Sequence, residues 1–207
     1  MISYTTSAFN EDRELGKLLS ILSRKISEDD EVIVQLDSDK VTEDVRKVCS
    51  IYQEKMPNLK VIEFPLDNDF ASFKNNIVHH CTKPWIFNID ADEMPTDFLI
   101  ENLNQVLEAN SSIEMFYVPR WNVVEGITEE HIKRWGWRYD DWGRINWPDW
   151  QTRIYKNKKE IVWQNKVHER LTGFETYGFL PEEKDWCLFH NKTIERQEKQ
   201  NDFYNRL

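Results

Sequence analysis

The sequence predicts an α/β protein with a mostly parallel sheet and helices on both of its faces. Three observations lead to this fold class. Apolar segments alternate with amphipathic segments four times within residues 1–90. The apolar segments are short and continuous, as in strands buried on both faces. The amphipathic segments repeat apolar residues at i, i+3, i+4 and i+7, which is the spacing of one helical face. Such alternation is typical of parallel sheets with right-handed crossovers.

The first half of the chain supplies the regular elements. Asn10, Glu11 and Asp12 can cap the first helix, and Pro57 ends the second. In order, we expect strands at 2–6, 32–36, 59–64 and 85–89, and helices whose apolar positions span 15–26, 41–52 and 70–81.

After Pro95 the regular alternation stops, although no linker or clean domain boundary follows. We therefore expect a single domain over 1–207, with 1–95 as its regular half and 96–207 as a second half that ends in a helix. In that second half we expect helices at 96–108 and 193–207, strands at 114–119, 121–125, 153–155, 161–163, 167–171 and 186–189, and irregular structure over 126–150.

The composition excludes several classes of protein. An apolar fraction of 40% rules out a disordered chain. No apolar run approaches the ~18–20 residues of a membrane span, and the N-terminus lacks a secretory signal. The three cysteines lie far apart without a C-x-x-C, which argues against a zinc knuckle or a disulfide scaffold. These features favour a cytoplasmic protein.

The net charge of −10 is unevenly distributed along the chain. Residues 120–170 contain 11 Lys and Arg against 8 Asp and Glu, a net of +3, whereas the rest of the chain carries −13. Seven of the nine tryptophans also fall between Trp121 and Trp163. This stretch is therefore both aromatic and comparatively basic.

Glycine is absent from the turns that follow the first two strands. A G-x-G-x-x-G dinucleotide site and a G-x-x-x-x-G-K-[ST] phosphate loop are therefore both missing. If a nucleotide binds, its phosphates must be neutralised by a metal ion or by side chains.

An acidic segment follows the fourth predicted strand. Asp90 and Asp92 are one residue apart, so their side chains point roughly the same way in an extended segment. Carboxylates at the carboxyl end of a parallel strand suit Mg²⁺ or Mn²⁺, which also bind phosphate oxygens. The alternative is that Asp92 and Glu93 cap the helix that begins near Thr96.

Several segments resemble family 2 glycosyltransferases with the GT-A fold, whose Rossmann-like sheet carries a small acceptor lobe. The resemblance spans most of the chain, and the Trp-rich segment and the ending are similar to small transferases of large tailed bacteriophages. The segments that carry it are Asn10-Glu11, Asp37, Phe70-Ala71-Ser72-Phe73-Lys74-Asn75, Asn88-Ile89-Asp90-Ala91-Asp92-Glu93, Gln151-Thr152-Arg153-Ile154-Tyr155-Lys156-Asn157, Val167-His168-Glu169-Arg170-Leu171 and Cys187-Leu188-Phe189-His190.

The resemblance implies a nucleotide-sugar site in residues 1–95 and a divalent cation, Mn²⁺ or Mg²⁺. Asp90 and Asp92 would hold this metal and His190 would be its third ligand. For Asp37, a turn aspartate that bonds its own backbone is an equal alternative. Position 74 is lysine, whereas members of this family usually have arginine there. The planar guanidinium, which can bind a phosphate through two hydrogen bonds, is therefore lost. The donor-binding residues implied are Thr5 or Thr6, Glu11, Asp37, Lys74, Asn75, Asp90, Ala91 and Asp92.

Transfer to a hydroxyl needs a base that accepts the proton of the acceptor. The resemblance points first to Glu169, with Asp149 and Asp141 as second choices. The alternative for Glu169 is a salt bridge to Arg170 or Arg153.

The Trp-rich stretch is the predicted acceptor region, because both sugars and bases stack on aromatic rings. The residues expected there are Trp135, Trp137, Trp142, Trp147, Trp150 and Arg144, while Trp121 and Trp163 are expected to fill the core of the lobe. The acceptor is either a glycan, free or lipid-linked, or a hydroxymethylated pyrimidine in phage DNA. Contacts to DNA would come from Arg134, Arg138, Arg144, Lys156, Lys158 and Lys159.

The function that the resemblance implies is a metal-dependent, inverting transfer of a sugar from a nucleotide diphosphate sugar. The usual donor in this family is a UDP-sugar. If the chain is phage-encoded, it would act in the host cytoplasm. Two alternatives remain open, namely a non-catalytic carbohydrate-binding module and a metal-dependent phosphohydrolase.

Overall fold

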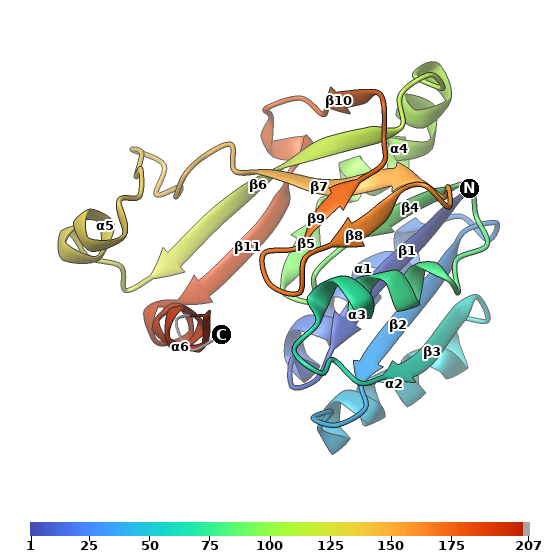
Figure 1. Ribbon diagram of the computed structural model, residues 1–207, viewed down its shortest axis with the longest axis horizontal. Coiled ribbons are helices and arrows are strands. Elements are labelled where there is room, and N and C mark those ends of the chain that lie inside the picture. Colours follow the sequence, from blue (N-terminus) through green and yellow to red (C-terminus); the bar gives the residue numbers. More distant parts are fainter. Residues whose placement is uncertain (205–207) are drawn as a thin grey trace.

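A computed structural model describes residues 1–204 and contains one large, strongly curled sheet (Figure 1). Nine strands form it in the order β3-β2-β1-β4-β7-β6-β11-β5, with β10 paired to β6 beside this path. The mixed α/β fold with a mostly parallel sheet is the one expected from the sequence.

The first half contains the predicted alternation. β1 pairs in parallel with both β2 and β4, and β2 pairs in parallel with β3. The elements are β1 (Ile2–Ala8), α1 (Asp12–Lys25), β2 (Glu31–Asp37), α2 (Glu43–Lys55), β3 (Leu59–Phe64), α3 (Phe70–Val78) and β4 (Trp85–Asn88).

The second half completes the sheet with mostly antiparallel strands. β7 pairs antiparallel with β4 and with β6, and β11 then pairs parallel with β6 and antiparallel with β5. The elements are β5 (Glu93–Pro95), α4 (Asp97–Ala109), β6 (Met115–Glu125), α5 (Glu129–Trp135), β7 (Trp150–Lys156), β8 (Val162–Gln164), β9 (Arg170–Thr172), β10 (Tyr177–Phe179), the 3₁₀ turn η1 (Lys184–Trp186), β11 (Leu188–Thr193) and α6 (Ile194–Tyr204).

Four sequence expectations in this half were wrong. The two strands expected at 114–125 form the single strand β6, which continues through Pro119. The segment expected to be irregular contains α5, capped by Thr128 and ended by Gly136 in the left-handed region. The strand expected at 167–171 begins only at Arg170, because His168 has a φ of 55°. The short strands β5 and β10 were not expected, since three residues carry no periodicity. Residues 205–207 of the last predicted helix lie outside the described residues.

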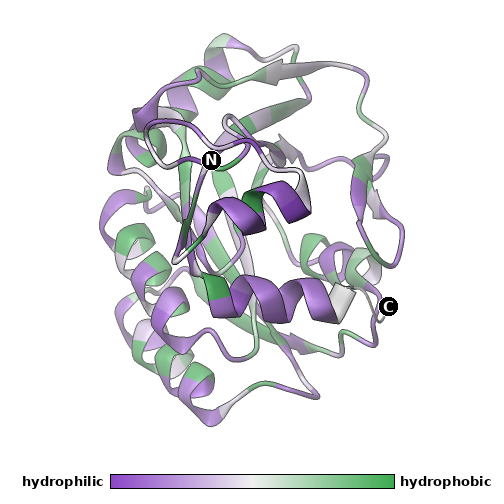
Figure 2. Cartoon of the chain, turned by 90° about the vertical axis from the view of Figure 1, so that its left-hand side faces the viewer, coloured by the Kyte–Doolittle hydropathy of each residue, from purple (hydrophilic) through white to green (hydrophobic). Residues whose placement is uncertain are grey.

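Two apolar clusters pack on opposite faces of the sheet. The larger one includes Tyr4 of β1 and Leu18 of α1, together with apolar residues of α2 and α4. The smaller one includes Ala71 of α3, Ile86 of β4 and Trp163 of β8. In Figure 2 the helices along the left of the view carry both hydrophobic and hydrophilic residues, whereas the two helices in front are mostly hydrophilic. α3 and the β8–β9 hairpin therefore cover the face opposite α1 and α2.

This topology brings the carboxyl ends of β1, β2 and β4 to one edge. The chain leaves β4 there, turns through residues 89–92 and returns as β5 against the distant strand β11. Figure 1 shows β6 and β11 running side by side away from the parallel strands toward α5, with α6 below them. Within residues 1–204, no helix is long and apolar enough to cross a lipid bilayer.

The β8–β9 hairpin depends on Gly173, and this can be tested. A Cβ at Gly173 would lie 1.8 Å from the carbonyl oxygen of Glu160, and its φ is 86°. Gly136 also has a positive φ, of 65°, but nothing lies within 4 Å of its Cβ position. Gly136→Ala should therefore cost only the left-handed penalty of about 1–2 kcal/mol. Gly173→Ala should cost at least twice as much in the free energy of unfolding, measured with urea. Equal costs would show that the hairpin tolerates the clash.

Candidate active site

The carboxyl edge of the parallel strands presents polar side chains on the α3 face. Tyr4 and Ala8 belong to the cluster under α1, so Thr5 faces the other way and Thr6 turns back toward that cluster. The hydroxyl of Thr5 donates to Oδ1 of Asn88, at 3.2 Å. Of the two threonines expected at a ligand site, Thr5 is therefore the one on the α3 face.

Asp37 ends β2 and is almost fully buried. Its Oδ1 accepts the backbone N–H groups of Asp39 and Leu66, at 3.2 and 3.3 Å. The alternative of a turn aspartate is thus correct for this oxygen. Its Oδ2 is buried without any hydrogen-bond partner among the described residues. Buried polar groups are rarely left unpaired, so this oxygen is available to a ligand.

Glu11 precedes α1 and shapes the loop after β1. Its Oε2 accepts the backbone N–H groups of Phe9 and Asn10, at 2.9 and 3.1 Å. It makes no side-chain capping bond to the helix. Its Oε1 lies 3.9 Å from Nη2 of Arg196 in α6.

The acidic segment after β4 does not cap α4. Thr96 fills that position and accepts the N–H of Leu99, at 3.0 Å. Asp90 forms an ion pair with the guanidinium of Arg153 in β7. Burial opposes ionisation of Asp90, but the charges of Arg153 and then Lys74 lower its pKa to about 2. Asp90 is therefore a carboxylate at neutral pH.

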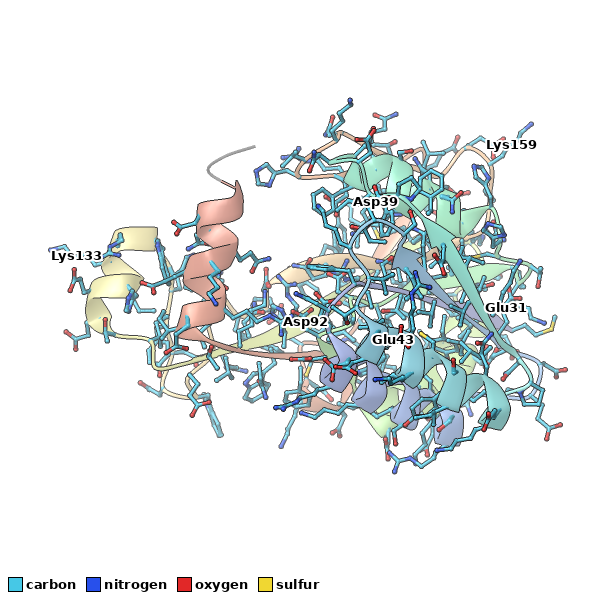
Figure 3. The ribbon with its side chains drawn as sticks, turned by 90° about the horizontal axis from the view of Figure 1, so that it is seen from below. Glu31, Asp39, Glu43, Asp92, Lys133 and Lys159 are labelled. Carbon is cyan, nitrogen blue, oxygen red and sulfur yellow. The ribbon has the colours of Figure 1, made fainter. Side chains whose placement is uncertain are left out.

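Asp92 lies between α6 and the body of the molecule (Figure 3). Its Oδ2 is 3.3 Å from Nε2 of His190, 3.4 Å from Nη2 of Arg196 and 3.8 Å from Nζ of Lys192. Burial raises the pKa of Asp92, but the hydrogen bond with His190 and the nearby cations hold it well below its usual range. Burial also lowers the pKa of Lys192, despite the attraction of Asp92.

Glu93 is fully buried beneath these acids. Its Oε1 accepts from Nη1 of Arg120 at 2.9 Å and from Nη2 of Arg153 at 2.7 Å. Its Oε2 accepts the backbone N–H of Asp90, at 3.2 Å. A buried carboxylate with two guanidinium partners ties β5 to β6 and β7 and fixes the turn that carries Asp90.

Asp149 precedes β7 and has polar partners on both of its oxygens. Its Oδ2 accepts from the guanidinium of Arg120, at 2.8 Å, and from Nδ2 of Asn122. Its Oδ1 accepts from Nε2 of Gln151, at 3.1 Å. Asp141, the other second choice for a base, is exposed in the loop that follows α5.

His190 is buried in β11 beside this network. Its Nδ1 lies 2.7 Å from Oδ1 of Asn122, and its Nε2 faces Asp92. Within residues 1–204 no three His, Cys, Asp or Glu side chains cluster as a complete metal site. A cation held here would therefore have two protein ligands, Asp92 and His190, and would need further oxygens from a ligand or water. Asp90, which is engaged by Arg153, is not part of this pair.

Glu169 lies in the loop before β9, facing α3. Its Oε1 is 2.7 Å from Nζ of Lys74. From the sequence, Arg170 or Arg153 was considered as the salt-bridge partner of Glu169. The partner in the structure is instead Lys74. Nζ of Lys74 also lies over the ring of Trp163, 4.4 Å from its centroid.

Asn75, the neighbour of Lys74, holds the hairpin to α3. Its Nδ2 donates to the carbonyl of Trp163 at 2.8 Å, and its Oδ1 accepts the N–H of the same residue at 2.9 Å. Both polar groups of this amide are therefore engaged. Ala91, between the two aspartates, is buried in the larger apolar cluster.

The tryptophans expected at an acceptor site lie in separate places. Trp135 and Trp137 pack on each other near α5, and Trp142 is 73% exposed. Trp147 packs on Trp121 and on the guanidinium of Arg144, which also pairs with Asp140. Trp163 is buried in the smaller apolar cluster, whereas Trp121, expected in the core with it, is only partly buried.

A different set of rings forms an exposed aromatic surface. Tyr177 and Phe179 of β10 are 55% and 52% exposed. Phe179 stacks on Tyr117 with centroids 4.8 Å apart and meets Trp150 edge-on, also at 4.8 Å. Phe174 packs against Tyr177 and the cluster under the hairpin. This aromatic surface consists of Tyr117, Trp150, Phe174, Tyr177 and Phe179, and it adjoins Asp149 through Trp150.

The basic residues considered for DNA binding do not form one surface. Those at 134–144 lie around α5, whereas those at 156–159 lie beyond the other end of β7. Figure 3 shows this separation, with Lys133 and Lys159 at opposite ends of the molecule. Arg134, Arg144 and Lys158 are also paired with Glu130, Asp140 and Glu114.

Sequence reasoning missed several residues of this site. Arg153 and Glu93 stand inside motifs that were noticed, yet nothing indicated that they pair. Asn122, Lys192 and Arg196 carried no signal, because their contacts with the acidic segment or its partners depend on strand order.

The chain was then compared with known proteins. The model of the family "Glycosyl transferase family 2" matches residues 3–179. The chain is 25% identical over 186 residues to the SPbeta prophage-derived glycosyltransferase SunS of Bacillus subtilis and to glycosyltransferase SunS of Bacillus phage SPbeta. The match covers 88% of this chain but only 37% of these relatives, so the chain spans well under half of their length.

Solved structures share the fold at low sequence identity. TarS 1–349 of S. aureus in complex with UDP-GlcNAc matches with a TM-score of 0.62 and 13% identity, over 92% of this chain and 58% of that one. The mannosyltransferase PcManGT of Pyrobaculum calidifontis, in complex with GDP-Man and Mn²⁺, matches with a TM-score of 0.50 and 17% identity, over 65% and 46%. The architecture is accordingly of the GT-A type.

The buried carboxylate of Glu93 yields a stability prediction. Glu93→Gln removes the charge between Arg120 and Arg153, and breaking a buried ion pair from one side costs about 3–5 kcal/mol. Glu101→Gln, which removes a half-exposed partner of Lys25, should cost about 1 kcal/mol or less. Urea unfolding of both variants measures the difference. Similar free energies of unfolding would show that Glu93 does not hold the second half of the sheet.

Proposed function

The chain belongs to glycosyl transferase family 2, and we propose that it transfers a sugar from a nucleotide diphosphate sugar to an acceptor hydroxyl. One observation carries this proposal. The carboxyl edge of the parallel strands combines the unpartnered Oδ2 of Asp37 with a group of cations around Asp90 and Asp92. Ligands of open α/β sheets bind at this edge, and such a site suits a nucleoside joined to a diphosphate.

The nucleoside would lie against the ends of β1 and β2. Oδ2 of Asp37 can accept one N–H or O–H from a base or ribose, and Thr5 stands on the same face. Because TarS of the same fold was solved with UDP-GlcNAc, we propose a UDP-sugar as the donor.

The diphosphate would lie over the acidic segment, next to Lys74, Lys192 and Arg196. Each of these cations is paired with a carboxylate that an anionic ligand can replace. Asp92 and His190 would hold a divalent cation, and PcManGT of this fold was solved with Mn²⁺. When bound, such a cation supplies positive charge for the departing diphosphate.

Glu169 is the base in this proposal. Its side chain pairs with Lys74, and binding of the diphosphate would draw Lys74 away. The acceptor oxygen then attacks the anomeric carbon, its proton passes to Glu169, and the bond to the diphosphate breaks. A single displacement of this kind inverts the anomeric configuration. Asp149, with both oxygens occupied, is better suited to hold its neighbours than to accept a proton.

A saccharide is the acceptor that the surface favours. The aromatic surface exposes Tyr177 and Phe179 beside the hairpin that carries Glu169, and exposed apolar patches of this kind mark ligand-binding grooves. DNA is disfavoured, because the basic residues are separated and largely paired.

Metal dependence is tested by thermal unfolding with UDP and Mn²⁺. Ligand at 100 times its dissociation constant should add about 2.7 kcal/mol of stability, and EDTA should remove the Mn²⁺-dependent part. Asp92→Asn should abolish that part, whereas Asp97→Asn, on the exposed start of α4, should not. Stabilisation by UDP that is unchanged by EDTA would mean that Lys192 and Arg196 neutralise the diphosphate alone.

The role of Glu169 is tested with UDP-GlcNAc and a panel of saccharide acceptors. Glu169→Gln should lower the transfer rate about 10²–10⁴-fold while UDP still binds, since only the base is lost. Glu160→Gln, which changes an exposed residue near the hairpin, should leave both the transfer rate and UDP binding unchanged.

The same assay separates the two rival functions. UDP-GlcNAc consumed equally fast without any acceptor would favour a phosphohydrolase. UDP-GlcNAc that binds but is never consumed would favour a binding module.

A further inference from the structure

The ring of His190 is fixed by a chain of hydrogen bonds that starts at Arg120. The guanidinium of Arg120 donates to Oδ2 of Asp149, at 2.8 Å. Nδ2 of Asn122 donates to the same oxygen, and Oδ1 of Asn122 lies 2.7 Å from Nδ1 of His190. These hydrogen bonds join the loop before β7 to β6 and β11.

Only one arrangement of donors satisfies this chain. The carboxylate of Asp149 can only accept, so Asn122 must turn its NH₂ group toward it. The carbonyl oxygen of Asn122 then faces His190, and Nδ1 of the ring must carry the hydrogen. In the neutral ring, Nε2 is consequently left with its lone pair.

That lone pair points at a second electron-pair donor. Nε2 of His190 lies 3.3 Å from Oδ2 of Asp92, and a cation bound between them would take the place of the proton that joins these two atoms when the ring is charged. Two ligands about 2.1 Å from an octahedral cation lie about 3.0 Å apart. The spacing therefore suits two neighbouring ligands of one cation.

We propose that Asn122 is a positioning residue that presents Nε2 of His190 to the metal, with Asp149 as its anchor. This inference rests on the proposed function, since it concerns the metal of that site. Hydrogen-bond partners of this kind fix the ring orientation of metal-bound histidines and typically contribute 10–100-fold to metal affinity. In this role Asp149 supports the metal site and takes no part in proton transfer.

The test is calorimetric titration of Mn²⁺ into the full chain in the presence of UDP. Asn122→Leu removes the acceptor for Nδ1 and should weaken Mn²⁺ binding about 10–100-fold. Asn122→Ser is the second variant, because its shorter polar side chain cannot reach the ring and puts no apolar group beside Asp149. It should weaken binding by a similar factor.

A charge-swapped pair provides the rescue. The double variant Asn122→Asp with Asp149→Asn restores an acceptor for Nδ1 of His190 and avoids placing two carboxylates side by side. Mn²⁺ affinity should return to within about threefold of the wild type, since Nδ1 of His190 again has an acceptor. The EPR spectrum of bound Mn²⁺ should return with it.

The outcomes separate this inference from the proposed function. Wild-type affinity in both single variants would overturn the role of Asn122 and leave the function intact. A wild type that binds no Mn²⁺ with UDP would instead overturn the metal in the proposed function. A double variant that recovers Mn²⁺ but not sugar transfer would overturn the exclusion of Asp149 from proton transfer.

Discussion

The buried carboxylate of Glu93, held between Arg120 and Arg153, is the interaction on which the rest of the structure depends. Glu93 lies on β5, and its partners lie on β6 and β7. β7 pairs antiparallel with β4, so this ion-pair triad joins β5 and β6 to the strand that borders the parallel half. Charges removed from water are costly unless they are well paired. Burial opposes ionisation of Arg153, but its carboxylate partners raise its pKa and keep it charged. The turn with Asp90 and Asp92 is thereby held at the sheet edge.

Close to this triad, three cations of an acidic protein pair with carboxylates at one edge of the sheet. The chain carries a net charge of −10, yet Lys74, Lys192 and Arg196 converge on carboxylates at the same edge. Pairing with carboxylates stabilises these cations without a ligand. A diphosphate offers them equivalent oxygens, so its binding exchanges one set of ion pairs for another. The cost of desolvating the cations is met during folding and not during binding.

The two faces of the sheet have different roles. The face under α1 and α2 is an apolar core, whereas the face under α3 carries Asp37, Lys74 and the hairpin with Glu169. The second half adds β11 and α6, which bring His190 and Arg196 to the acidic segment. The aromatic surface extends the α3 face beyond the sheet edge. Binding residues thus lie on loops and late elements that a rigid parallel sheet positions.

The sequence by itself determined the parallel half, because its apolar runs and helical spacings are local signals within a few turns of chain. It also indicated Asp37, Asp90 and Asp92, since these acids lie at or just beyond the ends of apolar strands. The tertiary structure alone decided which partners these acids meet. His190 reaches Asp92 across 98 residues, and this depends on β11 pairing with both β6 and β5. No local pattern encodes such a pairing, because strand order in a curled sheet is selected by the packing of the whole chain.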